Sequence, residues 1–262
     1  MVESTRAHER VTQKPLAGRR FSIEGVLGKP VEILITPAAA SASEVDLLIH
    51  FHGAGWLAMQ AAEESGRPLV VATVNLGAGG MRYSTALAEA GVFDELVRRA
   101  SEGSGRVKRI YLSGFSAGYG AIRSVLSAHA DRVDGALLLD GLHTGYLPEG
   151  KVMAEGAMLD EARLLPFLSY AERALRGEKQ LVITHSEIFP GTFASTTETA
   201  DWLLAKLAIE RTPVMKWGPL GMQQLSEVKR GKLTMLGFAG NTAPDHIDHF
   251  HALGTLLSLL ID

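Results

Sequence analysis

The sequence has 262 residues, enough to bury one large hydrophobic core. Hydrophobic residues make up 46% and charged residues 21% of it, which is typical of globular proteins and excludes disordered and fibrous classes. The net charge is −3 and cysteine is absent, so disulfides, thiol nucleophiles and thiolate metal sites are excluded. Because no basic surface is indicated, we expect a small-molecule partner and neither nucleic acid nor a membrane.

No apolar run approaches the roughly 18 residues that span a bilayer, and the first residues, 1–6, lack the apolar core of a signal peptide. We therefore expect a soluble protein. Its compartment stays open: cytoplasmic, or periplasmic or secreted if a leader was removed. A homodimer also stays open.

Two segments near the N-terminus, 21–26 and 31–35, alternate apolar and polar residues around Gly28-Lys29-Pro30, which predicts an antiparallel hairpin. The unbroken apolar runs that follow predict strands covered on both faces. These strands are expected at 45–51, 69–74, 107–112, 136–139, 180–184 and 232–238.

Apolar residues at helical spacing predict helices between these strands. The expected helices span 86–100, 121–130 and 199–209, with a terminal helix that carries Leu253, Leu256, Leu257 and Leu260. Alternating strands and helices predict an α/β protein with a mostly parallel sheet. The connection 143–179 is long and partly helical, so we expect a small lid there; no repeat or linker divides the single domain, 1–262.

The pentapeptide Gly114-Phe115-Ser116-Ala117-Gly118 has the Gly-X-Ser-X-Gly pattern. Alone it is weak evidence, because the pattern occurs readily by chance. Here a predicted strand runs directly into it and a predicted helix follows, which is the setting of a nucleophile elbow. We expect Ser116 to be a nucleophile and the Ala117 N–H to face a developing oxyanion. The alternative is a glycine turn with an ordinary capping serine.

A second glycine-rich segment, His52-Gly53-Ala54-Gly55-Trp56, ends the strand at 45–51. It resembles the His-Gly-Gly-Gly loop of esterases and lipases, in which a backbone N–H near Gly53 or Ala54 supplies the second oxyanion donor. Trp56 and Tyr119 are candidate substrate contacts beside this loop and the elbow. Phe189, Phe193 and Trp217 are further candidates for an apolar acyl pocket.

Three histidines near the C-terminus are candidates for the general base. We favour His246, because it follows a turn-rich stretch, over His249, which lies closer to or inside the terminal helix. For the acid we favour Asp140, which ends an apolar strand and precedes Gly141, over Glu187, which follows the strand at 180–184.

From residue 45 to the C-terminus, these motifs and their order of Ser, acid and His resemble the α/β-hydrolase superfamily. The resemblance implies a mostly parallel central sheet of about eight strands flanked by helices. It also implies a serine esterase that cleaves a small carboxylic ester through an acyl-enzyme, with no metal or organic cofactor. Short acyl chains are the expected substrates.

Other functions stay open on the same fold: a catalytically inactive binding protein, or an acyltransferase or peptidase that uses the same triad. A metal hydrolase is disfavoured, because Ala54 and Gly55 stand where a His-X-His-X-Asp-His site needs ligands. A nucleotide site is disfavoured too, since Gly77-Ala78-Gly79-Gly80-Met81-Arg82 lacks the third glycine of the dinucleotide fingerprint.

Overall fold

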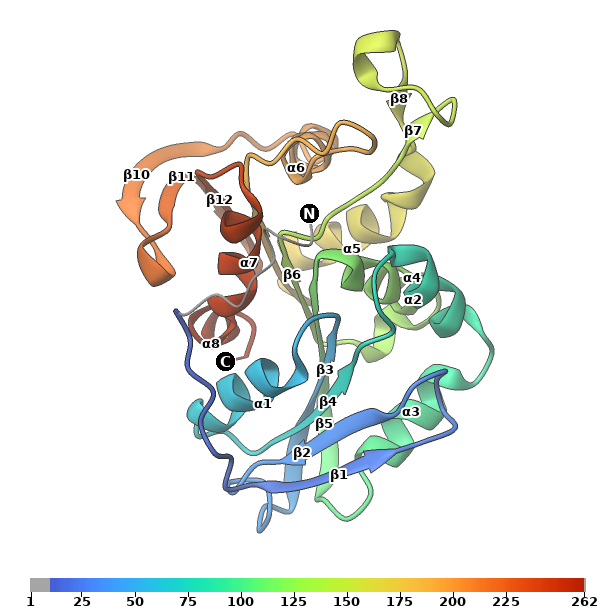
Figure 1. Ribbon diagram of the computed structural model, residues 1–262, viewed down its shortest axis with the longest axis vertical. Helices are drawn as coiled ribbons and strands as arrows, with labels where there is room; N and C mark the ends of the chain where they lie inside the picture. The colour runs from blue at the N-terminus through green and yellow to red at the C-terminus, as the bar shows by residue number, and fades with distance from the viewer. Residues whose placement is uncertain (1–9, 262) are drawn as a thin grey trace.

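A ten-stranded sheet runs through the centre of the computed structural model, which describes residues 10–261 (Figure 1). Its strand order is β1-β2-β4-β3-β5-β6-β9-β12-β11-β10, and the six strands from β4 to β12 in that order are parallel. The strands are β1 (Arg19–Ile23), β2 (Val31–Ile35), β3 (Glu44–Phe51), β4 (Leu69–Val74), β5 (Arg106–Phe115), β6 (Gly135–Leu139), β9 (Gln180–His185), β10 (Thr212–Trp217), β11 (Gln223–Arg230) and β12 (Leu233–Phe238).

The predicted α/β class, the N-terminal hairpin and the parallel centre are confirmed. The sheet has ten strands where about eight were expected, because β10 and β11 form an antiparallel extension at one edge of the sheet. The strand β10 is mostly exposed and contains Pro213, so it carries neither an apolar run nor a clear alternating pattern. The segment 1–6 lies outside the described residues.

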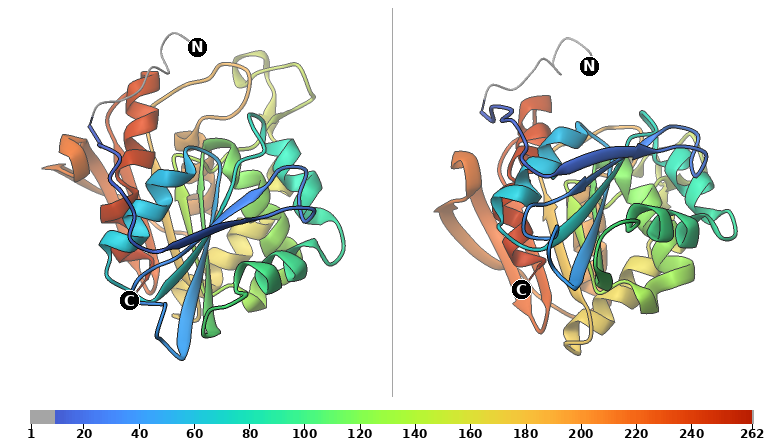
Figure 2. Two further views of the ribbon diagram at one scale, coloured as in Figure 1. Left: turned by 60° about the horizontal axis from the view of Figure 1, so that its bottom comes forward. Right: turned by 90° about the horizontal axis from the view of Figure 1, so that it is seen from below.

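Helices cover both faces of the sheet (Figure 2). Side chains of α1 and α8, with Phe250 of α7, pack in a core on one face, and those of α2 to α6 pack on the other. The helices are α1 (Gly55–Glu64), α2 (Gly80–Ala88), α3 (Val92–Ala100), α4 (Tyr119–His129), α5 (Leu165–Leu175), α6 (Thr196–Lys206), α7 (Ala243–His251) and α8 (Leu253–Leu256). Within residues 10–261, no helix is long and apolar enough to span a membrane.

Two helix predictions need correction. The single helix expected over 86–100 is two helices, α2 and α3, because the chain turns at Gly91, whose φ of +79° suits glycine. The helix α1 was not predicted, since its apolar residues follow a glycine-rich loop that marks a turn.

The expected lid segment, 143–179, has two parts. Its second part contains α5, whose Phe167, Tyr170 and Ala174 are buried in the main core. Its first part stands away from the sheet as a two-stranded ribbon, β7 (Tyr146–Leu147) and β8 (Met158–Leu159), at the upper right of Figure 1. Only this first part, about residues 144–163, has the form of an insertion.

Candidate active site

The segment around Ser116 is a sharp turn between β5 and α4. Ser116 begins a single 3₁₀ turn, Ser116–Gly118, and its φ is +46°, a conformation uncommon for any residue with a side chain. A Cβ at Gly118 would overlap the carbonyl oxygen of Phe51, and one at Gly114 would lie 2.9 Å from Ile122 Cδ1. The two glycines of the pentapeptide therefore allow strand and helix to pack closely, with the partly exposed Ser116 at the tip of the turn.

Asp140 immediately follows β6, the parallel neighbour of β5. The residue is 1% exposed, and its φ of +42° turns the chain directly after the strand. Four donors approach its carboxylate: the Ser186 N–H at 2.9 Å, the Ser186 hydroxyl at 2.7 Å, the Thr196 hydroxyl at 2.5 Å and His246 Nδ1 at 2.6 Å. The buried carboxylate is therefore well satisfied by hydrogen bonds.

The same partners decide the charge state of Asp140. Burial by itself raises the pKa of a carboxyl, but the charges of His249 and His246 and the hydrogen bonds from His246 and Thr196 lower it more. The net effect holds the pKa of Asp140 well below its usual range. At neutral pH this side chain is an anion that holds the Nδ1–H of His246.

His246 lies in the first turn of α7, not on a loop before the helix as its turn-rich context suggested. Thr242 is the N-cap residue, and both its N–H and its hydroxyl donate to Asp245, at 2.8 and 2.6 Å. This cap fixes the start of α7 and so the position from which His246 points toward Asp140.

Two contacts bring the chain around Ser116 close to His246 and Asp140. The ring of Phe115, which precedes Ser116, lies 4.5 Å from the His246 ring between centroids. Gly141, next to Asp140, packs against the nucleophile, since a Cβ there would lie 3.1 Å from Ser116 N. The three chain segments that carry Ser116, Asp140 and His246 thus lie side by side at the carboxyl ends of β5, β6 and β12.

The alternative acid and base make other contacts. Glu187 is exposed, and its backbone N–H donates to the carbonyl of Gly240 at 3.0 Å. His249 is 1% exposed, and its Nδ1 lies 2.8 Å from the Thr184 hydroxyl. The structure brings together Asp140 and His246 rather than either alternative.

Solved structures share the fold of this chain. Neither a scan against protein-family models nor a search of curated proteins by sequence gives a match. Among solved structures, an S-formylglutathione hydrolase from Agrobacterium tumefaciens is 12% identical with a TM-score of 0.54, over 94% of this chain and 95% of that one. Est1E from Butyrivibrio proteoclasticus is 11% identical with a TM-score of 0.51, over 94% and 100%.

A thermostable esterase is 11% identical with a TM-score of 0.52 over 92% of this chain, which spans 60% of the length of that esterase. The strand order, the tight turn at Ser116 and these likenesses agree. The chain has the α/β-hydrolase fold. At this level of identity the likeness shows the fold alone.

In this α/β-hydrolase fold, the predicted oxyanion loop links β3 to α1. His52 and Gly53 have φ values of +73° and +99°, and the Gly53 carbonyl accepts a hydrogen bond from Asn75 Nδ2 at 2.9 Å. A Cβ at Gly53 would lie 2.7 Å from the Phe250 ring, so only glycine fits there. Ala54 is the exposed N-cap residue of α1.

His50 supports this loop through two hydrogen bonds, a role that no sequence motif indicated. Its Nε2 lies 2.7 Å from the His52 carbonyl and its Nδ1 lies 2.8 Å from the Ser113 hydroxyl. Because a carbonyl only accepts, Nε2 carries the hydrogen and Nδ1 accepts from Ser113. Burial lowers the pKa of His50 to about 4, so the ring is neutral at neutral pH and stacks on Phe250 at 5.1 Å.

An aromatic cluster lies beside the elbow. Tyr119 and His143 pack in a T-shaped arrangement with ring centroids 5.4 Å apart, and His143 packs against Phe193 in the same way at the same separation. Sequence reasoning named Tyr119 and Phe193 but missed His143, whose signal is its position three residues after Asp140. Trp217 lies apart from this cluster, exposed on β10.

Three candidates remain. Phe189 is exposed in the loop after β9. Ala117 is buried within the 3₁₀ turn, directly after Ser116, and Trp56 lies in the first turn of α1, partly buried against the core. Within residues 10–261, no group of three or more His, Asp or Glu side chains is arranged to hold a metal ion.

Proposed function

We propose that this protein is a serine hydrolase that cleaves small carboxylic esters through an acyl-enzyme on Ser116. The observation that carries the proposal is the 2.6 Å contact between His246 Nδ1 and Asp140 Oδ2, in a site where Gly141 packs against Ser116. A buried, ionised carboxylate that fixes a histidine beside a strained serine is the arrangement used in acyl transfer.

Each residue has a chemical role in the proposed reaction. Ser116 Oγ attacks the ester carbonyl carbon while His246 Nε2 takes the hydroxyl proton, and Asp140 stabilises the imidazolium that forms. His246 then gives the proton to the departing alcohol, leaving the acyl group on Ser116. Water, deprotonated by His246, attacks the acyl-enzyme and releases the carboxylic acid.

The negative charge that develops on the carbonyl oxygen requires donors. We assign this role to the N–H of Ala117 and an N–H of Gly53 or Ala54. Ala117 follows the nucleophile directly, and His50 and Asn75 hold the carbonyls of His52 and Gly53, so the loop is fixed before substrate arrives. The reaction as proposed requires no metal or cofactor.

We propose short acyl chains as substrates. The insertion at 144–163 is small, with two strands of two residues each, so it offers little apolar surface to enclose a long chain. Tyr119, His143 and Phe193 form the proposed wall of the acyl site, and p-nitrophenyl butyrate is expected to react faster than the palmitate ester.

The test is ester hydrolysis by the wild-type protein and by Ser116→Ala, with Ser127→Ala, an exposed serine of α4, as a matched control. The proposal expects hydrolysis that is lost in Ser116→Ala and kept in Ser127→Ala. If folded wild-type protein hydrolyses no ester, thioester, lactone or amide, an inactive binding protein is the better assignment; products transferred to an acceptor other than water indicate an acyltransferase.

A further inference from the structure

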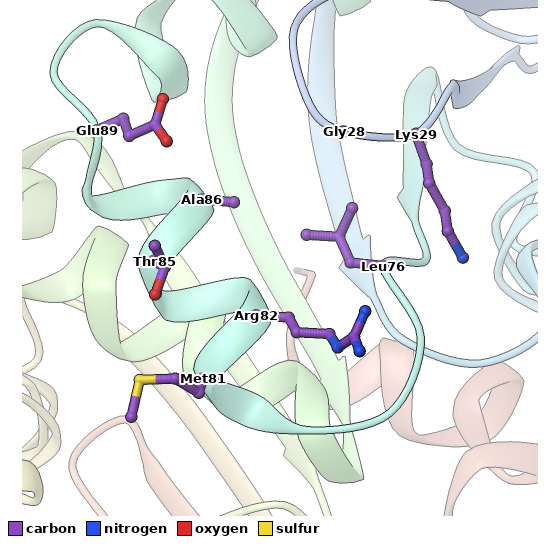
Figure 3. A pocket seen from close by; sticks show the side chains of 8 residues that line it. All are labelled: Gly28, Lys29, Leu76, Met81, Arg82, Thr85, Ala86 and Glu89. Carbon is purple, nitrogen blue, oxygen red and sulfur yellow. The ribbon is translucent and has the colours of Figure 1, made fainter.

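Two neighbouring cavities line the end of the sheet beside the oxyanion loop. The first, about 220 Å³, is bounded by Gly53, Ala54 and Asn75. The second, about 560 Å³, lies between Lys29 in the β1–β2 turn and Arg82 on α2 (Figure 3). Lys29 and Leu76 line the second cavity, and their chain neighbours Pro30 and Asn75 line the first, so the two cavities lie side by side. We call the two together the groove; its first cavity is walled by the oxyanion loop.

Three cations line the groove. No hydrogen bond or ion pair joins the side chain of Arg20, Lys29 or Arg82 to another residue of the described range 10–261. Arg82 reaches from α2 toward the wall that carries Lys29 (Figure 3). Lys29 Nζ lies 4.0 Å from the position that a Cβ at Gly77 would occupy, which places the ammonium beside the loop that leads into α2.

The groove also contains two carboxylates, one in each cavity. Glu89 lines the second cavity at the other end of α2 from Arg82, as Figure 3 shows, and Glu32 lines the first cavity. Three cations therefore face two carboxylates in a chain whose net charge is −3. Two of the three cations, Lys29 and Arg82, lie near Leu76 in the second cavity (Figure 3).

Hydrogen bonds tie this end of the groove to the proposed oxyanion loop. The Tyr83 hydroxyl, on α2, accepts from the Leu76 N–H at 3.0 Å and lies 3.0 Å from His52 Nδ1. Asn75, which binds the Gly53 carbonyl, is the residue before Leu76. A molecule in the groove would lie against the same loops that hold the reacting carbonyl.

We propose that this groove binds the carboxylate end of the substrate, so that the preferred substrates are esters whose acyl or alcohol part carries a carboxylate. Lys29 and Arg82 would pair with that carboxylate, since charge-assisted hydrogen bonds from a guanidinium are the stronger kind. The apolar side chains of Leu76, Met81 and Ala86 in the same cavity suit the methylene chain between the two ends. This inference rests on the proposed ester hydrolysis.

The test compares monoesters of dicarboxylic acids, from succinate to suberate, with their neutral diesters, and butyryl esters of hydroxy acids with the methyl esters of the same compounds. The first pair carries the carboxylate on the acyl side and the second on the alcohol side. We expect kcat/KM for the carboxylate form to exceed that for the neutral form by about tenfold in at least one series. The preference should shrink as salt is added, because screening weakens charge pairing.

The variant Lys29→Gln/Arg82→Gln is expected to lower this preference by about tenfold. The control Arg230→Gln/Lys232→Gln removes two exposed cations from the β11–β12 turn and should leave the preference unchanged. The inference would be overturned if the wild type hydrolysed neutral and carboxylate esters equally well. It would also be overturned if the Lys29→Gln/Arg82→Gln variant kept the preference. If no ester of either kind is hydrolysed, it is the proposed function that fails.

Discussion

His246 Nδ1 and Asp140 Oδ2 lie 2.6 Å apart although 106 residues separate them in the sequence. The contact joins the end of a central strand to the first turn of α7, so it exists only in the folded sheet. The buried Asp140 accepts from Ser186 and Thr196 as well, which fixes the carboxylate and through it the imidazole.

The first prediction separates the two candidate acids. Asp140→Asn is expected to lower kcat by about 10³-fold to 10⁴-fold, because the amide no longer selects the Nδ1–H tautomer or stabilises the imidazolium. Glu187→Gln, at the exposed alternative position, should leave kcat unchanged. Steady-state kinetics on p-nitrophenyl butyrate, with circular dichroism to check folding, makes the comparison. A larger loss in Glu187→Gln would move the acid to that residue.

The second prediction separates the two histidines. His246→Gln should abolish most activity and keep the fold, since His246 is partly exposed and lies near the helix start. His249→Gln should instead cost stability, about 1–3 kcal/mol, because a buried side chain that bonds Thr184 is replaced. Denaturant unfolding and kcat per folded molecule distinguish the two variants. Full activity in His246→Gln would exclude His246 as the base.

The third prediction concerns the packing of the elbow. Gly118→Ala should lower the free energy of unfolding by about 3 kcal/mol or more, because the added Cβ would overlap the Phe51 carbonyl and strand and helix would have to separate. Gly145→Ala is the control, since nothing lies within 4 Å of a Cβ at Gly145. Equal melting temperatures for the two variants would show that the turn is looser than described.

Much of this arrangement could be predicted from the sequence. The central strands are unbroken apolar runs, and Ser116 and Asp140 directly follow two of them. Because these strands are parallel, both residues lie at the same edge of the sheet. The strand β10 could not be predicted, because an exposed edge strand has no core-facing pattern. The role of His50 depends on contacts with Ser113 and Phe250, which are distant in sequence, so no local sequence motif indicates this role.

The fourth prediction follows from His50. Its pKa is lowered from 6.5 to about 4 by burial, so between these values the unfolded chain binds more protons than the folded one. The free energy of unfolding should therefore fall as pH is lowered from neutral to about 4, by about 3 kcal/mol from this residue. Urea unfolding should show a weaker pH dependence in His50→Gln. The same dependence in both proteins would mean that His50 does not titrate as described.

The measurement that tests the central claim most directly is covalent labelling with a fluorophosphonate, followed by mass spectrometry of the modified peptide. The reagent reacts with a serine only when a neighbouring base activates it. We expect the label on Ser116 in the wild type, none in Ser116→Ala, and slow labelling in His246→Gln. Label on another serine, or folded wild-type protein that stays unlabelled, would contradict the assignment of Ser116 as an activated nucleophile.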